Sequence, residues 1–299
     1  MFLYLLYKPA IREFLRYKGF INSKTQNTRV SWFMKTTNHL NREKTALITG
    51  ASGGIGYELA KLFARDGYNL VLVARSEEKL TQIAKEFSEK SGIKVEIIVK
   101  DLSLATTPAE IFTKLQQAAI KIDVLVNNAG FGSYGFFHET DLKTELEMLQ
   151  VNVVSLTHLT KLFLKDMVEQ GYGKILNVSS GAAFQPGPLL AVYFATKAYV
   201  LSFSEAIANE LEGTGVTVTV VCPGTTASGF QQRAAMEESK LVTSQNVMDA
   251  ETVAKISYQG LMSNKTVVVP GIKNKLLAEA VRFTPRKMVV KIARSMNSK

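Results

Sequence analysis

The stretch Lys44-Thr45-Ala46-Leu47-Ile48-Thr49-Gly50-Ala51-Ser52-Gly53-Gly54-Ile55-Gly56 decides the fold of this chain. Its apolar run at 46–48 predicts a short buried strand. Residues 57–65 predict a helix with its large apolar side chains inward, namely Leu59, Leu62 and Phe63. A strand, a glycine-rich turn and a helix in this order direct free backbone N–H groups at a pyrophosphate. The alternative is a glycine-rich loop that holds no ligand.

Three glycines of this turn have separate physical tasks. Gly50 permits a sharp turn, Gly54 lets the backbone approach a phosphate, and Gly56 lets the helix pack closely on the strand. The spacing T-G-x-x-x-G-x-G differs from the commoner G-x-G-x-x-G. The turn therefore predicts dinucleotide binding, in a variant form of the motif.

Apolar runs of strand length recur along the chain, separated by segments of helix length. They span 45–49, 69–74, 94–99, 122–126, 173–178, 216–221 and 266–269. Continuous apolar runs are typical of strands that are covered on both faces. Strands that alternate with helices predict right-handed parallel crossovers. We therefore expect an α/β fold, a single-domain doubly wound parallel sheet of about seven strands with helices on both faces.

A tyrosine and a lysine in Tyr193-Phe194-Ala195-Thr196-Lys197 lie four residues apart, which places them on one face of a helix. A free phenol titrates at about pH 10 and is a poor proton carrier at neutral pH. A cation one turn away stabilises the phenolate and lowers the phenol pKa toward the range that acid–base catalysis needs. Such pairs also arise by chance on many helices, so a catalytic role for this pair depends on the presence of other motifs.

Further landmarks occur in the order of a known family. Asp101-Leu102 follows the third strand, Asn127-Asn128-Ala129-Gly130 follows the fourth, and Pro223-Gly224 follows the sixth. Asn152 stands at the head of a long helix, and Ser180 precedes Tyr193 by thirteen residues. Together with the glycine turn, these residues resemble the short-chain dehydrogenase/reductase family over residues 44–271.

The resemblance implies a Rossmann-like fold and an oxidoreductase that interconverts a carbonyl and an alcohol. Tyr193 would donate or accept the proton, Ser180 would hold the substrate oxygen against it, and Lys197 would lower the tyrosine pKa and bind the nicotinamide ribose. Asn152 would hold a water that links Lys197 to solvent. The implied cofactor-binding residues are Thr49, Gly50, Ser52, Gly54, Ile55, Gly56, Arg75, Asp101, Leu102, Asn128, Ala129, Gly130, Tyr193, Lys197, Pro223, Gly224 and Thr225.

The end of the second strand distinguishes between cofactors. An NAD enzyme carries an acid near this point to bind the ribose 2′-hydroxyl, but here Ala74 occupies the place and Arg75 follows it. The planar guanidinium of Arg75 suits a 2′-phosphate, so the sequence predicts NADP(H). A second basic residue, frequent in the family's glycine turn, is replaced by Gly53. The alternative is a solvated arginine at the end of a strand.

Three segments are predicted to wall the substrate pocket: 131–134, 181–190 and a mobile lid at 225–244. Their apolar side chains indicate a lipophilic carbonyl or alcohol, such as a fatty acyl or steroid-like compound. They are Phe184, Pro186, Leu189, Leu190 and Phe230. The alternative is that these side chains pack on one another.

A competing class is a nucleotide sensor or scaffold that kept the fold and lost the chemistry. The intact set of Asn152, Ser180, Tyr193 and Lys197 speaks against that class. The lone Cys222 cannot form an intrachain disulfide, and no Cys/His cluster offers metal ligands, so we expect no metal. No G-x-S-x-G motif is present around the paired serines, which argues against an esterase.

Basic residues are concentrated at the two ends of the chain. Residues 1–44 hold nine Lys and Arg against two Glu, and residues 272–299 hold eight against one, whereas the whole chain has a net charge of +10. The middle is therefore mildly acidic, which argues against nucleic-acid binding. Basic, apolar tails favour reversible contact of a cytoplasmic protein with an anionic membrane. The alternative is a solvated N-terminus and a C-terminal helix packed on the fold or on a neighbouring subunit of a homo-oligomer.

These observations divide the chain into an N-terminal extension at 1–43, a catalytic domain at 44–271 and a helical tail at 272–299. Pro285 is expected to split the tail into two short helices. The apolar start at 1–7 is shorter than the roughly 20 residues of a spanning helix and lacks the charge order of a signal peptide. Three interpretations of the extension stay open: a surface-lying anchor, a disordered segment, or residues upstream of a native start at Met34.

Overall fold

The computed structural model describes residues 43–230 and 247–298. Nearly all of the predicted N-terminal extension and most of the predicted lid, residues 231–244, lie outside the described residues. From Glu43 onward the chain forms one compact unit.

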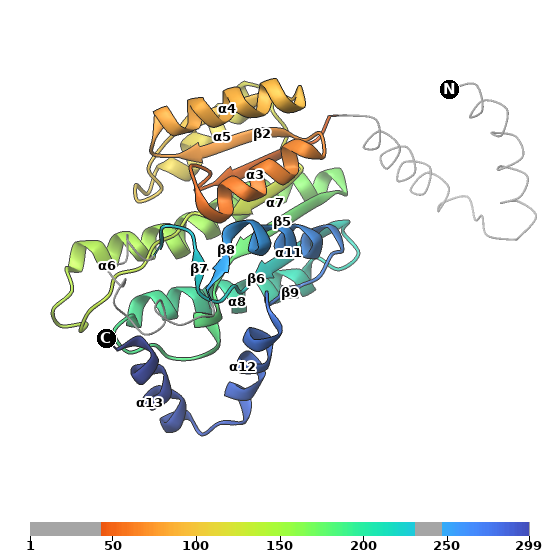
Figure 1. Cartoon of the computed structure of the whole chain (residues 1–299). Helices are drawn as coiled ribbons and strands as arrows, with labels where there is room; N and C mark the ends of the chain where they lie inside the picture. Colours follow the sequence, from red (N-terminus) through yellow and green to blue (C-terminus); the bar gives the residue numbers. More distant parts are fainter. Residues whose placement is uncertain (1–42, 231–246, 299) are drawn as a thin grey trace, which may run out of the picture. The chain divides into compact units, whose positions relative to one another are not determined.

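A parallel sheet of seven strands forms the centre of this unit (Figure 1), which confirms the predicted fold class. The spatial order of its strands is β3-β2-β1-β4-β5-β6-β9, and each neighbouring pair is parallel. The strands are β1 (Thr45–Thr49), β2 (Asn69–Ala74), β3 (Val95–Val99), β4 (Val124–Asn127), β5 (Gly173–Val178), β6 (Val216–Val221) and β9 (Val267–Val268). Because the order reverses between β1 and β4, the carboxyl ends of these two strands border a crevice, which is where open α/β sheets bind ligands.

Helices cover both faces of the sheet (Figure 1). The first face carries α3 (Gly54–Arg65), α4 (Glu77–Ser91) and α11 (Ala250–Met262). The second face carries α5 (Thr107–Gln117), α7 (Leu156–Gln170) and α8 (Ala191–Glu210). Successive strand residues alternate between the two cores: Ala46 and Ile48 belong to the first and Leu47 to the second. All three are fully buried, as expected for strands covered on both faces.

The remaining elements surround the carboxyl edge of the sheet. They are α6 (Leu142–Leu149), a π-helix (Gln150–Ser155), a 3-10 helix (Gly181–Phe184), the short parallel pair β7 (Thr226–Ala227) and β8 (Met248–Asp249), and the C-terminal helices α12 (Ile272–Phe283) and α13 (Arg286–Asn297). The break between α12 and α13 confirms that Pro285 divides the tail.

Sequence and structure differ at several boundaries. The helix after the glycine turn begins at Gly54, three residues earlier than predicted. The fourth strand begins at Val124, two residues later than predicted, and the Asp123 carboxylate before it accepts a hydrogen bond from the Thr45 N–H at 2.9 Å. The last strand shrinks to two residues, and the β7–β8 pair was not predicted because two-residue strands carry no periodic pattern.

Gly56 brings α3 against the end of β1 closer than any other residue would allow. A Cβ at this position would lie 2.4 Å from the Gly50 carbonyl oxygen and 2.5 Å from the Asn128 Nδ2. Gly53, three residues earlier, has extended backbone and no atom within 4 Å of such a Cβ. The structure thus supports the packing role that the sequence assigned to Gly56.

We expect Gly56→Ala to lower the free energy of unfolding by about 1–3 kcal/mol, because neither the backbone oxygen nor the amide can move without breaking contacts. Gly53→Ala is the matched control and should change it by less than about 0.5 kcal/mol. Urea unfolding of the two variants and the wild type measures both values. Equal stability of the two variants would contradict the close approach.

Candidate active site

A single cavity of about 1090 Å³ follows the carboxyl edge of the sheet, from the glycine turn to the C-terminal helices. Most of the sequence-predicted cofactor residues line it: Gly50, Ser52, Gly54, Ile55, Arg75, Asp101, Leu102, Asn128, Ala129, Gly130, Tyr193, Lys197, Pro223, Gly224 and Thr225. Ser180 lines it as well. Residues from six loops, separated by more than 170 positions in the chain, therefore meet at one site.

The glycine turn is shaped to hold a pyrophosphate. Gly50 and Gly54 have positive φ angles of 67° and 55°, which residues with side chains rarely adopt. A Cβ on Gly54 would also lie 2.9 Å from the Ser228 carbonyl oxygen, whereas one on Gly53 would point into open space. The turn runs into the N-terminus of α3, where backbone N–H groups and the helix dipole favour an anion. These residues fit a dinucleotide phosphate group.

Thr49 and Gly56 do not line the cavity and lie in the structure that supports it. The Thr49 hydroxyl donates to the Val126 carbonyl oxygen at 3.2 Å and accepts from the Asn128 and Ala129 N–H groups, both at 3.0 Å. The Asn128 amide in turn donates to the Thr49 and Gly50 carbonyl oxygens. Thr49 therefore joins the first and fourth strands and is not positioned to touch a ligand.

Polar side chains line the end of the cavity beyond β2, among them Arg75, Ser76 and Lys79. Arg75 is largely exposed, and its guanidinium lies 3.8 Å from the Asp101 carboxylate. Ser76 caps the N-terminus of α4, and Lys79 lies in the first turn of that helix. Lys79 was not predicted, because the family's second cation was expected inside the glycine turn. The spacing Arg75-x-x-x-Lys79 at the start of a helix was the available signal.

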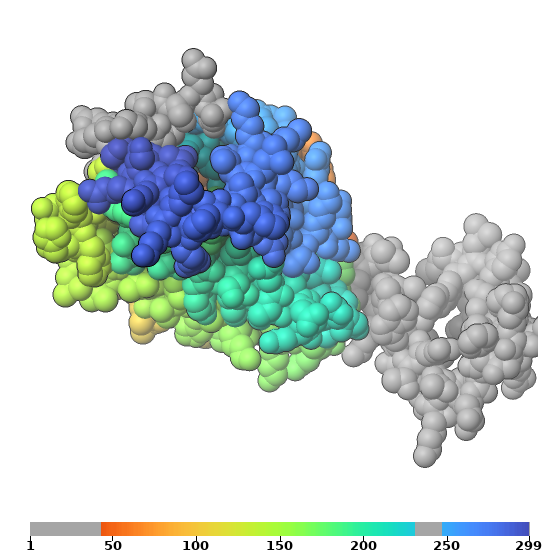
Figure 2. Space-filling model, turned by 90° about the horizontal axis from the view of Figure 1, so that it is seen from below, coloured from red at the N-terminus to blue at the C-terminus, as the bar shows by residue number. Residues whose placement is uncertain are grey.

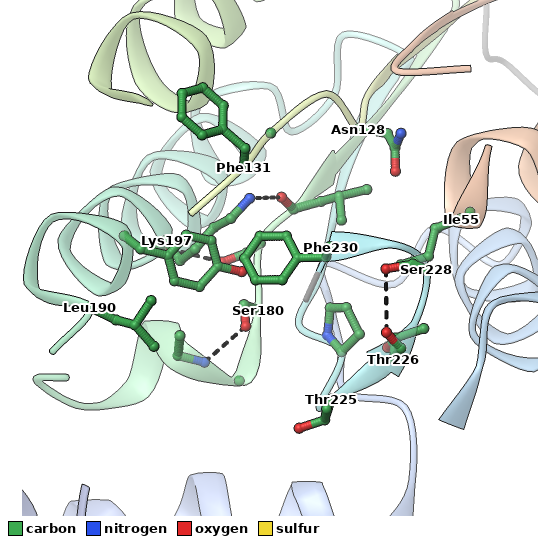
Figure 3. Close-up of a pocket in the computed structure, with 18 of the residues that line it drawn as sticks. Ile55, Asn128, Phe131, Ser180, Leu190, Lys197, Thr225, Thr226, Ser228 and Phe230 are labelled. Atoms are coloured by element: carbon green, nitrogen blue, oxygen red, sulfur yellow. Dashed lines mark hydrogen bonds between the residues drawn. The ribbon is translucent and has the colours of Figure 1, made fainter. Parts of the chain in front are cut away.

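Tyr193 lies in the first turn of α8, one turn before Lys197, and both side chains are buried. Burial raises the pKa of the Tyr193 phenol to about 12, and a hydrogen bond with Ser180 acts in the opposite direction. Ser180 also accepts a hydrogen bond from the Ala182 N–H at 3.1 Å, which fixes its hydroxyl at the start of the 3-10 helix (Figure 3). The structure thus brings the phenol and the serine hydroxyl together.

The Lys197 ammonium group donates to the Val178 carbonyl oxygen at 2.9 Å and lies 5.7 Å from the centre of the Tyr193 ring (Figure 3). Burial lowers the pKa of Lys197 to about 8. That Lys197 lowers the tyrosine pKa stays a prediction, while the net direction for the buried phenol is upward. Desolvation of the phenol dominates, because the buried phenolate loses more hydration than the serine hydrogen bond returns.

Asn152 lies in the π-helix between α6 and α7 and not at the head of an ordinary helix. Its amide donates to the Phe131 carbonyl oxygen at 2.9 Å and to the Thr196 hydroxyl at 3.1 Å, and it accepts from the Phe131 N–H at 3.2 Å. A Cβ on Gly130 would lie 3.0 Å from the Asn152 Oδ1 and 3.4 Å from the Lys197 Nζ. Asn152 therefore holds the loop after β4 beside Lys197 and does not itself line the cavity.

Of the apolar residues predicted for the substrate pocket, Phe184, Leu190 and Phe230 line the cavity, as does Phe131. Pro186 and Leu189 do not reach it. The Phe230 ring packs on the Tyr193 ring, with 5.0 Å between ring centres. The predicted lid begins with buried structure, because Thr226 is buried in β7 and donates to the Gly224 carbonyl oxygen at 3.0 Å. The start of the predicted lid therefore contains a short strand, and its mobility stays a prediction.

The far end of the cavity is formed by α12 and α13, the basic C-terminal helices for which membrane contact was predicted. Leu277 and Val281 of α12 and Val289, Ile292 and Met296 of α13 line it. The alternative for the tail, a helix packed on the fold, agrees with the burial of Val289 and Ala293 on α13. Their amphipathic spacing was visible in the sequence, but the identity of the surface that they cover was not.

Comparison with known proteins identifies the family. The family model described as short chain dehydrogenase matches residues 44–239. The chain belongs to the short-chain dehydrogenase family. It is 39% identical over 184 residues to a very-long-chain 3-oxoacyl-CoA reductase of Anas platyrhynchos, covering 60% of this chain and 58% of the relative. It is 38% identical over 183 residues to the 17-beta-hydroxysteroid dehydrogenase type 3 of Mus musculus.

The match therefore spans a little over half the length of these curated relatives. A solved short-chain dehydrogenase from Sphingobium yanoikuyae, in complex with NADPH, is 32% identical and superposes with a TM-score of 0.73. That comparison covers 80% of this chain and 94% of the solved chain. The fold and the order of the motifs are thus those of the family.

Proposed function

We propose that this short-chain dehydrogenase family member is an NADP(H)-dependent oxidoreductase that interconverts a lipophilic carbonyl compound and its alcohol. The observation that carries the proposal is that Tyr193, Ser180 and Lys197 meet in the same cavity as the glycine turn. The cofactor, when bound, supplies or accepts the hydride. The protein contributes the proton, the orientation of the substrate oxygen and the exclusion of water.

In the reducing direction, the Ser180 hydroxyl would hold the substrate carbonyl oxygen beside the Tyr193 phenol, which donates its proton to that oxygen. A phenol whose pKa is raised by burial stays protonated at neutral pH and is in the form needed for donation. The Lys197 ammonium group would offset the negative charge left on the phenolate, at short range in a site of low dielectric constant. Asn152 acts as a positioning residue through Phe131 and Thr196.

Two features support a lipophilic substrate. The cavity beyond Tyr193 is walled by Phe184, Leu190 and Phe230 and by the C-terminal helices. The relatives are a very-long-chain 3-oxoacyl-CoA reductase and a 17-beta-hydroxysteroid dehydrogenase, both named for lipophilic substrates. The same proposal includes a homo-oligomer whose catalytic core is cytoplasmic.

Replacing Tyr193 with Phe removes the proton donor and keeps the ring that packs against Phe230. We expect the turnover number to fall by about 10²–10⁴-fold, the usual contribution of a positioned acid or base, with cofactor affinity nearly unchanged. In the wild type, oxidation should accelerate as the pH rises, because it needs the phenolate, and reduction should slow.

Steady-state rates with NADPH and a set of lipophilic ketones, together with fluorescence titration of the cofactor, measure both effects. Phe194→Leu in the same helix turn is a control for packing. Undiminished turnover in Tyr193→Phe would favour the competing class, a nucleotide sensor or scaffold without chemistry.

The preference for NADP(H) rests on Arg75 and Lys79, two cations at the end of the cavity beyond Ala74. Arg75→Ala should weaken NADPH binding by about 1.5–3 kcal/mol, the range for a hydrogen bond to a charged group, and leave NADH binding almost unaltered. Lys79→Ala should act in the same direction. Ala74→Asp should shift preference toward NADH, because it adds an acceptor for the ribose hydroxyl and repels a 2′-phosphate.

Titration of each variant with both cofactors provides the measurement, and Lys85→Ala, on the same helix but outside the cavity, is the control. Wild-type protein that binds NADH as tightly as NADPH would show that Arg75 is a solvated residue at a strand end.

We also propose that the C-terminal helices make reversible contact with anionic membranes. The face of α12 turned away from the cavity carries Ile272, Leu276 and Phe283, which are 80%, 65% and 87% exposed. Lys275 and Arg282 are exposed on the same helix. Among the described residues, none of the helices combines the length and the hydropathy that crossing a membrane requires. Contact at the surface is therefore the form of attachment that fits α12.

Cosedimentation with phosphatidylserine-containing vesicles tests this contact. We expect binding at low ionic strength that declines as salt is added, with roughly 1 kcal/mol from each basic residue near the surface. Phe283→Ser should reduce binding, whereas Leu104→Ser, which changes another exposed apolar residue, should not. Failure to bind at low salt would limit the tail to its role in closing the cavity.

A further inference from the structure

Helix α13 buries one narrow face against the loops of the active site. Its buried residues are Val289, Ala293 and Asn297, spaced four apart, and the last two are only 1% exposed. The residues between them are mostly exposed. A polar side chain as buried as Asn297 must have hydrogen-bond partners, and those partners identify what the helix is attached to.

Asn297 connects two loops of the active site. Its side-chain amide donates to the Pro188 carbonyl oxygen at 2.8 Å. Its main-chain carbonyl oxygen accepts a hydrogen bond from the Tyr134 hydroxyl at 2.9 Å. These contacts join residues 109 and 163 positions apart in the chain. The Arg294 guanidinium, one turn earlier, lies over the Phe136 ring at 4.8 Å.

The two loops that Asn297 contacts flank the proposed chemistry. Pro188 stands between Ser180 and Tyr193, and Tyr134 follows the Phe131 segment that Asn152 holds. The loops are also joined directly, because the Gly135 N–H donates to the Leu189 carbonyl oxygen at 2.9 Å. Leu189 has a φ of 70°, which a leucine rarely adopts, so this loop conformation depends on its surroundings.

The same helix supplies the end wall of the cavity. Val289, Ile292 and Met296 line it from α13, and Leu277 and Val281 line it from α12. Figure 2 shows the C-terminal helices, in the darkest blues, on either side of a recess in this face of the molecule. All five side chains are apolar, so this end of the cavity suits the distal, hydrocarbon part of a substrate whose carbonyl lies at Tyr193.

We propose that Asn297 is a positioning residue that latches α13 as the end wall of the substrate cavity, and that this wall determines the enzyme's selectivity for long or bulky hydrocarbon substituents. The inference rests on the proposed reduction of a carbonyl at Tyr193 and adds the determinant of substrate size. When the latch is intact, each methylene group that reaches Ile292 and Met296 is removed from water by a fixed surface. When it is released, the helix moves away and that gain is lost.

The test compares reduction of straight-chain methyl ketones of increasing length by the wild type, Asn297→Ala and Ile292→Ala. In the wild type, kcat/KM should rise by up to about fourfold for each methylene group that the end wall buries. In Asn297→Ala, kcat/KM should rise less steeply with chain length. The value for long ketones should fall about tenfold through a higher KM, and the value for short ketones should stay almost unchanged. Ile292→Ala should reproduce the loss for long ketones, because it removes wall surface without touching the latch. Ser295→Ala, exposed on the same helix, should match the wild type.

Hydrogen exchange supplies a second measurement that needs no substrate. The amides of residues 286–297 should exchange faster in Asn297→Ala than in Ser295→Ala, while those of α8 stay protected. Equal loss at every chain length, or unchanged exchange in α13, would overturn the latch and leave the proposed oxidoreductase in place. A wild-type protein that reduces no ketone in the series would overturn the proposed function and this inference with it.

Discussion

The hydrogen bonds between β1 and β4 are the constraint on which the rest of the site depends. At this point the strand order reverses, so the two halves of the sheet meet here and nowhere else. Asn128 donates hydrogen bonds to Thr49 and Gly50 across the junction, which align the glycine turn of the first half with the loop after β4 of the second. These hydrogen bonds therefore fix the glycine turn relative to the loop that carries Gly130.

Burial shapes the electrostatics of the tyrosine and lysine in opposite directions. It raises the pKa of Tyr193 and lowers that of Lys197, since the loss of water disfavours the charged form of each group. Hydrogen bonds to Ser180 and Val178 limit this cost. The π-helix contributes by placing the amide of Asn152 where it holds both the loop after β4 and Thr196 on α8. Irregular helices of this kind often accompany functional sites.

The sequence predicted the parts of this molecule that depend on local pattern. The four strands at 45–49, 69–74, 173–178 and 216–221 have the predicted bounds, because continuous apolar runs between turns identify buried strands. The glycine turn could also be predicted from the sequence, since the positive φ angles of such a turn favour glycine. What was not predicted depends on contacts between distant segments: the hydrogen bonds by which Thr49 joins β1 to β4, and those of Asn297 with two loops of the site. The raised tyrosine pKa escaped for the same reason, because the spacing of two residues does not reveal how deeply they are buried.

The central position of β1 has a consequence for biosynthesis. β1 pairs with β2 on one side and with β4 on the other, and its partner Asp123 lies 78 residues beyond Thr45. At translation rates of about 5–20 residues per second, the second edge of β1 stays without its partner for roughly 4–16 seconds after the strand has been made. During this interval the emerging chain exposes an apolar, unpaired strand edge of the kind that promotes association between chains. The arrangement that fixes the glycine turn in the finished protein therefore delays the pairing of its central strand during synthesis.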